Sequence, residues 1–194
     1  TGGCFVIWVD TFNGEDPEKE MDAIIRNMQD EMAETEEFVL VHNTAEILEA
    51  KKDGKIAMLL GLEGLAGIGE EIDRIHGLYD IGCRHAMLTW NEENALATGV
   101  KGTPDRGVTE LGKKAIRLIQ DKKMILDVSH LNEKSFWDVM DATTAPILAS
   151  HSNAKALAGA ARNLTDDQLR AIRDTKGLVG LNAFNDFVSD SKAE

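Results

Sequence analysis

The chain has 194 residues, 43% of them hydrophobic and 28% charged, which is enough for one sizeable hydrophobic core. Its formal net charge of -13 argues against nucleic-acid binding and against a membrane-surface role, because phosphate backbones and anionic lipids repel it. No stretch approaches the roughly 20 apolar residues of a transmembrane helix and the N-terminus lacks a signal-peptide pattern, so a cytoplasmic location is expected.

Six apolar runs have the length of buried β-strands, and they are continuous, as is typical of parallel strands covered on both faces. They span residues 4–9, 56–63, 85–90, 124–130, 146–151 and 178–184. Segments with helical periodicity separate them: one begins at Pro17 behind a capping Asp16, and others cover residues 70–80, 110–121, 133–142 and 165–174. The alternation predicts βαβ units and a parallel sheet.

The ends of these runs favour a barrel over an open doubly wound sheet. An open sheet usually has a glycine-rich phosphate turn after its first strand, and none follows the first run here. Several runs instead close on polar or aromatic residues, where a barrel builds its active site: Glu63, Trp90 with Asn91, Ser129 with His130, Ser150 with His151, and Asn182. We therefore expect an α/β fold of the (β/α)8 TIM-barrel class. Residues 1–194 would form one partial barrel domain, because six runs are found where eight strands are needed.

Glu63, His130 and His151 are the candidate metal ligands. Strand ends around a barrel mouth bring distant residues together, so these three side chains should converge. One carboxylate and two imidazoles form a common ligand set for catalytic zinc, which lowers the pKa of a bound water to about 7. A structural role for each residue is the alternative.

Other polar residues receive structural predictions. His42, His76 and His85 are expected to lie outside the metal site, with His85 at the bottom of the barrel. Cys4 and Cys83 have no metal-type spacing and are predicted to be buried free thiols.

Two serines and one arginine lie next to or after the candidate ligands. Ser129 and Ser150 are not expected to be nucleophiles, because adjacent strand residues point to opposite faces, which keeps each hydroxyl from the neighbouring histidine. Arg162 lies in the loop after His151, where it would bind a substrate carboxylate bidentately. The alternative is a surface ion pair with Asp166 or Asp167. Residues 91–109 are predicted to be a loop over the barrel mouth.

Seven segments carry a resemblance that runs from about residue 1 to residue 188. They are GLEGL, LTWNEENALATG, RGVTELGKKAI, ILDVSHLNEKSFWDV, PILASHSNAKAL, ARNLTDDQLRAI and GLVGLNAFNDF. In this order they resemble the membrane (renal-type) dipeptidase family, the zinc enzymes of peptidase family M19. The resemblance implies a (β/α)8 barrel that is related to the amidohydrolases, holds two zinc ions and hydrolyses dipeptides.

The resemblance also implies roles for single residues. Glu63 would be the catalytic carboxylate that bridges the two zinc ions, and His130 and His151 would be ligands of the second zinc. Arg162 matches the arginine that binds the C-terminal carboxylate of the dipeptide. Trp90 stands where mammalian members have a substrate-contacting histidine and many bacterial members have tryptophan, which suggests a bacterial-type enzyme.

The chain departs from the family pattern in two places. The His-x-Asp pair that holds the first zinc has no match before Glu63, and the aspartate of the last barrel strand is not reached. The chain therefore looks like strands two to seven of a dipeptidase, with ligands for one zinc. We expect it to be a piece of a longer protein and to have weak or absent activity by itself.

The predicted function of the parent protein is hydrolysis of a dipeptide by a zinc-bridging hydroxide. Asn182 is a further predicted substrate-binding residue. The expected partner is a dipeptide, with no nucleic acid and no membrane, and homodimerisation stays open. Two alternatives remain: a non-catalytic barrel remnant that acts as a binding or scaffold protein, and another amidohydrolase-like enzyme that opens cyclic amides.

Overall fold

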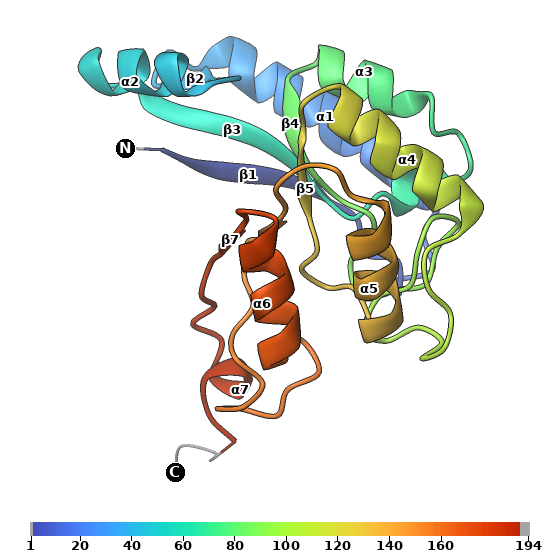
Figure 1. Ribbon diagram of the computed structural model, residues 1–194. Coiled ribbons are helices and arrows are strands. Elements are labelled where there is room, and N and C mark those ends of the chain that lie inside the picture. Colours follow the sequence, from blue (N-terminus) through green and yellow to red (C-terminus); the bar gives the residue numbers. More distant parts are fainter. Residues whose placement is uncertain (1, 191–194) are drawn as a thin grey trace.

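The computed structural model describes residues 2–190, which form a curled parallel sheet with helices outside it, part of a (β/α) barrel (Figure 1). Six strands follow each other in the order β1-β3-β4-β5-β6-β7, and β2 pairs with the start of β3. The strands are β1 (Gly2–Trp8), β2 (Phe38–Leu40), β3 (Ile56–Glu63), β4 (Cys83–Met87), β5 (Ile125–Asp127), β6 (Leu148–Ala149) and β7 (Leu178–Val179). All strand pairs in this sheet are parallel.

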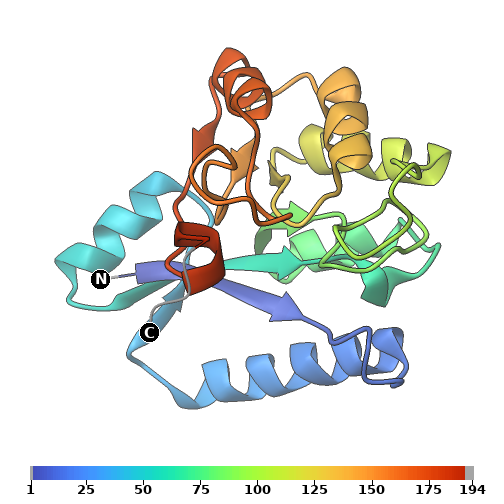
Figure 2. The ribbon, with the colours of Figure 1, turned by 90° about the horizontal axis from the view of Figure 1, so that it is seen from below.

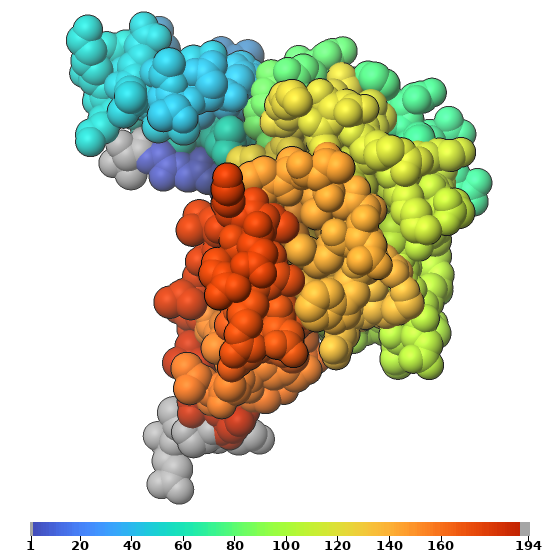
Figure 3. Space-filling view, in the orientation of Figure 1, coloured from blue at the N-terminus to red at the C-terminus, as the bar shows by residue number. Residues whose placement is uncertain are grey.

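The helices follow the strands, and all but the short last one cover the convex face of the sheet (Figure 1). They are α1 (Pro17–Glu34), α2 (Thr44–Lys52), α3 (Arg74–Asp80), α4 (Glu110–Asp121), α5 (Glu133–Ala142), α6 (Asp166–Asp174) and α7 (Asn185–Val188), with a 3-10 turn at Ala66–Ile68. Figure 2 shows the longer helices in an arc around the strands. In the space-filling view, α4, α5 and α6 form adjoining parts of the outer layer (Figure 3).

Capping residues set the starts of these helices. Asp16 accepts a hydrogen bond from the backbone of Glu18, and Pro17 occupies the first turn of α1. Thr165 and Gln168 form a reciprocal capping box at the start of α6. These side chains pair N–H groups that would otherwise lack a partner in the first turn, and so fix the residue at which each of these helices begins.

The hydrophobic core lies between the sheet and the helices. It includes Ile7 of β1, Leu60 of β3, Ile116 of α4 and Phe136 of α5, each at most 2% exposed. Side chains alternate along a strand, so Val6 and Trp8 face the concave side and are partly exposed. Burial of each large aliphatic or aromatic side chain contributes about 1.5–3 kcal/mol to the stability of the fold. This layer therefore holds the helices against the sheet.

The predicted architecture is confirmed, with corrections in detail. All six predicted runs contain a strand, although the later strands end earlier than predicted. The strand β2 and the helix α2 were not predicted, because the apolar run at residues 38–41 is only four residues long and α2 has a weak apolar stripe. Cys83 is a buried free thiol as predicted, but Cys4 is free and exposed, because it lies on the concave face of β1. None of the helices in residues 2–190 is both long and apolar enough to cross a bilayer.

His85 also differs from its predicted place. It lies in the middle of β4 rather than at the start of a strand, and its side chain is 3% exposed. Its Nε2 atom lies 2.7 Å from Oδ2 of Asp127 on the neighbouring strand β5. The prediction placed His85 at the bottom of the barrel because the apolar run was read two residues too late.

Candidate metal centre

Three side chains from separate strand ends converge at one point. Glu63 is the last residue of β3, and His130 and His151 follow β5 and β6 within three residues. The Nε2 atom of His130 lies 2.9 Å from Oε1 of Glu63 and 2.8 Å from Nε2 of His151. The Nε2 atom of His151 lies 3.5 Å from the same carboxylate oxygen. The three ligand atoms are all within 4.8 Å of one another, as the sequence predicted for a metal site.

The turn after β3 places Glu63 beside the next strand. Gly64 has φ 96°, a left-handed conformation that favours glycine, and a Cβ atom there would lie 2.8 Å from the backbone nitrogen of Trp90. The chain can therefore pass close to Trp90. This close approach brings the end of β3 next to the segment that follows β4.

His130 has an unusual backbone. Its φ of 77° is rare for a residue with a side chain and costs of order 1–3 kcal/mol unless the surroundings hold it. Its carbonyl oxygen accepts a hydrogen bond of 2.9 Å from the backbone of Val100, in the loop after β4. This left-handed turn directs the imidazole toward Glu63.

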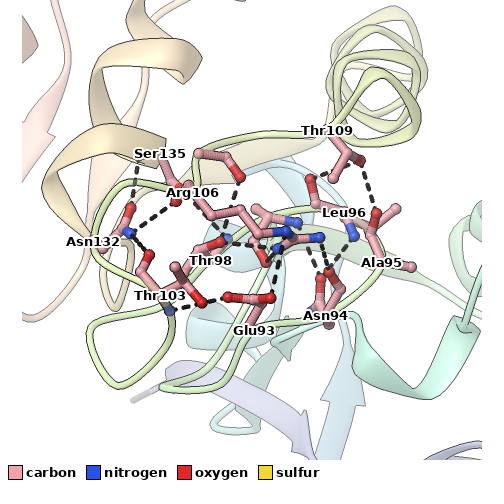
Figure 4. Close-up of polar contacts among 12 residues, drawn as sticks. Glu93, Asn94, Ala95, Leu96, Thr98, Thr103, Arg106, Thr109, Asn132 and Ser135 are labelled. Carbon is pink, nitrogen blue, oxygen red and sulfur yellow. Dashed lines mark hydrogen bonds and ion pairs between the residues drawn. The ribbon is translucent and has the colours of Figure 1, made fainter.

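The loop that holds His130 spans residues 91–109 and has no regular helix or strand (Figure 4). Arg106 donates to the carbonyls of Asn94 and Ala97 inside the loop. The side-chain nitrogen of Asn132, the residue that caps α5, donates to three loop carbonyls, those of Thr103, Pro104 and Arg106. The predicted loop is thus a compact segment that packs against the turn carrying His130.

Burial and neighbouring charges set the protonation states of the three ligands. Burial, aided by the positive charge of Arg162, lowers the pKa of His130 to about 4 despite its hydrogen bond to Glu63. Burial and Arg162 also lower the pKa of His151. The hydrogen bond from His130 lowers the pKa of Glu63 although burial opposes this. At neutral pH the carboxylate is therefore charged and both imidazoles are neutral, which are the forms that bind a cation.

The other ring nitrogens of the two histidines are occupied by neighbouring side chains. Nδ1 of His130 lies 3.0 Å from Oδ1 of Asn91, and Nδ1 of His151 lies 2.7 Å from the hydroxyl of Ser150. In the tautomer that carries its proton on Nδ1, where the oxygens of Asn91 and Ser150 can accept it, Nε2 of each histidine has a free lone pair for a metal. The donor set and its orientation therefore fit a divalent cation held by Glu63, His130 and His151.

The contact between Ser150 and His151 corrects the prediction that neither serine could pair with its neighbouring histidine. The strand β6 ends at Ala149, so both residues lie in a turn where strand alternation no longer applies. Asn91 was noted only as a residue at a strand end. The position of the Asn91 amide at this strand end indicates that it could orient one of the candidate ligands.

Arg162 lies inside the site. It is 9% exposed, and its Nε atom lies 3.0 Å from Nδ1 of His130. Its two terminal nitrogens are buried and have no hydrogen-bond partner among residues 2–190. The alternative of a surface pair is wrong, because Asp166 and Asp167 pair with Arg170 instead. Arg162 and His130 also line a cavity of about 510 Å³ that extends toward α5.

Aromatic side chains border the site on the side of β1 and β4. The ring of Trp90 lies 6.2 Å from that of His130, and Trp8 and Phe12 pack on it at 5.1 and 5.6 Å between ring centroids. The ammonium of Lys101 lies 5.8 Å from the Trp90 ring. Trp8 and Phe12 were not predicted as site residues, because aromatic side chains near a strand are more often part of a core.

Asn182 forms hydrogen bonds with Asn153 and Phe184 rather than with the candidate metal ligands. Its side-chain oxygen accepts a hydrogen bond from the backbone of Phe184, and its backbone N–H donates to Oδ1 of Asn153. These contacts hold the segment between β7 and α7. Substrate binding by Asn182 stays a prediction.

Comparisons with known proteins agree with this geometry. The family model for membrane dipeptidase (peptidase family M19) matches residues 7–194. An uncharacterized Klebsiella pneumoniae protein is 41% identical over 152 residues, which cover 75% of this chain and 56% of that protein. An uncharacterized dipeptidase of Schizosaccharomyces pombe is 34% identical over 142 residues, which cover 71% of this chain and 34% of that protein.

Two solved structures have the same fold. A metallopeptidase from Rhodobacter sphaeroides, liganded with a phosphinate mimic of the dipeptide L-Ala-D-Ala, superposes with a TM-score of 0.87 at 30% identity. A dipeptidase of family M19 superposes with a TM-score of 0.84 at 33% identity. The chain is covered to 97% and 96%, but it spans only 63% and 60% of those two chains.

Proposed function

The chain belongs to the membrane dipeptidase family, peptidase family M19, and from this premise we propose that the whole protein hydrolyses dipeptides with the help of bound zinc. The observation that carries the proposal is the convergence of Glu63, His130 and His151 within 4.8 Å. The Rhodobacter metallopeptidase, whose ligand mimics a dipeptide, supports this class of substrate.

Glu63, His130 and His151 would hold one zinc ion. A bound zinc ion supplies Lewis acidity, which polarises a peptide carbonyl and lowers the pKa of the attacking water. The chain's own residues prepare this site: the Glu63 carboxylate supplies negative charge, and Asn91 and Ser150 orient the two imidazoles. The low pKa of His130 keeps its ring neutral and available as a ligand.

Arg162 would bind the C-terminal carboxylate of the substrate. Its guanidinium is buried beside His130, and its two terminal nitrogens are free for a bidentate pair with a carboxylate. A longer peptide continues past the second residue and has no carboxylate at this point. Arg162 would therefore select dipeptides, and the Trp90 ring would pack against the substrate beside it.

The second zinc of the family would need ligands that this chain does not supply. The resemblance places them on a His-x-Asp pair and on a last-strand aspartate, and neither motif occurs in the sequence at the matching place. We propose that the 194 residues by themselves bind one zinc and hydrolyse dipeptides weakly or not at all.

Zinc content and dipeptide turnover test the proposal together. Metal analysis of the purified chain should find about one zinc per molecule, and the full-length protein should hydrolyse dipeptides but not tripeptides. Arg162→Ala in the full-length protein should raise KM for dipeptides about 10- to 100-fold, because a charged hydrogen-bonded pair contributes roughly 1.5–3 kcal/mol.

Arg170→Ala is the matched control, since Arg170 pairs on the surface with Asp166 and Asp167. It should leave KM unchanged. Zinc binding without turnover of any dipeptide would favour a non-catalytic binding protein. Turnover of cyclic amides alone would favour a different amidohydrolase reaction, and an unchanged KM in Arg162→Ala would remove Arg162 from the site.

A further inference from the structure

A buried carboxylate lies below the candidate metal centre and takes no part in the chemistry described above. Asp127, the last residue of β5, is 0% exposed. We propose that Asp127 is a positioning residue that joins the turns carrying His130 and His151 and so determines the affinity for zinc. The inference rests on the metal site of the proposed function.

One oxygen of Asp127 joins the two turns. Oδ1 accepts hydrogen bonds from the backbone of Ser129 at 2.9 Å and of Ser150 at 3.2 Å. Each of these residues directly precedes one of the histidine ligands in the chain. The strands β5 and β6 themselves share few backbone bonds here, since their register is a single pair, Asp127 with Leu148. The carboxylate therefore sets the spacing between the two turns.

The serine hydroxyls extend this link to the second imidazole. The hydroxyl of Ser129 accepts a hydrogen bond of 3.2 Å from the backbone of His151, and it lies 3.5 Å from the hydroxyl of Ser150. The Ser150 hydroxyl in turn lies 2.7 Å from Nδ1 of His151. A continuous chain of polar contacts thus runs from Asp127 to a metal-binding ring.

The second oxygen of Asp127 is held by His85. Nε2 of His85 lies 2.7 Å from Oδ2, and both side chains are buried. Burial opposes a charged imidazole, but contacts with Asp127 and Cys4 outweigh it and raise the pKa of His85 to about 9. Both oxygens of the carboxylate therefore accept hydrogen bonds, Oδ1 from two backbone N–H groups and Oδ2 from His85.

A buried ion pair inside a barrel is energetically costly. Apolar residues usually occupy this layer, and a charged pair there loses its hydration. A neutral asparagine could keep both backbone contacts through its one amide oxygen, but it would present an NH2 group in place of the oxygen that faces His85. The geometry therefore points to a role in which three donors must be held at once.

Zinc affinity of the 194-residue chain is the test, measured by competition with a chromogenic chelator. Asp127→Ala, which removes the acceptor shared by the two turns, should weaken zinc binding about 10- to 100-fold, the usual effect of losing a residue that orients metal ligands. Ser150→Ala should weaken it about tenfold through His151 alone.

Two control variants separate positioning from general stability. Ser152→Ala removes a buried hydroxyl that has no hydrogen-bond partner among the described residues, two positions from Ser150. Thr165→Ala removes the cap of α6 and should lower the urea midpoint of unfolding without touching the site. The zinc affinity of both variants should stay within about twofold of that of the unmodified chain.

The outcomes are distinct. If the unmodified chain binds zinc and Asp127→Ala binds it equally well, the positioning role is overturned and the proposed function stands. If the unmodified chain binds no zinc, the proposed function fails and this inference fails with it. Should Asp127→Ala not fold, Ser129→Ala and Ser150→Ala test the same link, and unchanged zinc affinity in both would overturn it.

Discussion

The turns that carry His130 and His151 are held in different ways. His130 is 6% exposed, has a left-handed backbone, and is held by a loop some thirty residues earlier in the sequence, through Val100 and Asn91. The His151 side chain is 27% exposed and is held by hydroxyl groups of two nearby serines.

The difference shows that two candidate ligands of one site can depend on largely separate parts of a fold, although Asp127 contacts both turns. The His130 turn depends on long-range packing of the segment 91–109. The His151 turn depends on a short polar chain that starts at Asp127. We therefore expect variants of the loop and variants of the serines to weaken zinc binding by different routes.

The largest expected effect comes from the ligand that both turns share. Glu63→Gln keeps the size of the side chain but removes the charge that faces both imidazoles. Zinc affinity of the chain should fall by more than about 100-fold, because a lost ligand costs more than a lost orienting partner. Glu46→Gln, at a surface pair with His42, is the control and should bind zinc normally. Retention of zinc within tenfold in Glu63→Gln would mean that the ion binds elsewhere.

The pH dependence of stability separates His130 from the buried pair below it. The pKa of His130 falls to about 4 on folding, so the unfolded chain binds more protons between pH 4 and 6.5, and stability is lost as the pH falls through this window. The pKa of His85 rises to about 9, so its contribution is complete below pH 6.5 and is lost as the pH rises toward 9. Each shift corresponds to roughly 3 kcal/mol.

Urea unfolding of the zinc-free chain between pH 4 and 9 measures this dependence. The free energy of unfolding should be largest near pH 6.5, since the two histidines act with opposite sign. His76→Gln, at an exposed position on α3, should leave the profile unchanged. A flat profile would contradict both burial effects.

A smaller effect is expected from the residue that fastens the loop to the His130 turn. Asn132→Asp keeps an oxygen that caps α5 but replaces the nitrogen that donates to three loop carbonyls. The free energy of unfolding should fall by roughly 2 kcal/mol, because buried carbonyls lose their donor. Asn132→Ser, which also keeps a capping oxygen but adds no charge, shows how much of the loss is repulsion. Equal stability of all three proteins in urea would show that the loop is held by packing alone.

The smallest expected effect concerns the orientation of the His130 ring. Asn91→Ala removes the side chain 3.0 Å from Nδ1, and zinc affinity should fall about tenfold while the fold remains. Asn43→Ala removes a helix cap far from the site and should cost about 1 kcal/mol of stability without changing zinc affinity. A larger zinc effect in Ser150→Ala than in Asn91→Ala would show that the more exposed histidine is the less firmly held.

Much of the fold was predictable from the sequence because apolar periodicity is local. The run at residues 56–63 matches β3 in full, and the capping pattern at Thr165 marks the start of α6. The elements that were missed are short: β2 is apolar but has three residues, and α2 has little apolar contrast, so the formation of both depends on contacts with β3.

The sequence also determined which side chains could bind a metal, because Glu63, His130 and His151 each follow an apolar run and strand ends meet at one edge of a parallel sheet. Only the tertiary structure decided what surrounds them. Arg162 was equally compatible with the surface until folding placed it against His130, and Ser150 and Asp127 became partners of the site through turn geometry. Such contacts join residues from different strands, so they depend on angles and register that no local pattern of residues encodes.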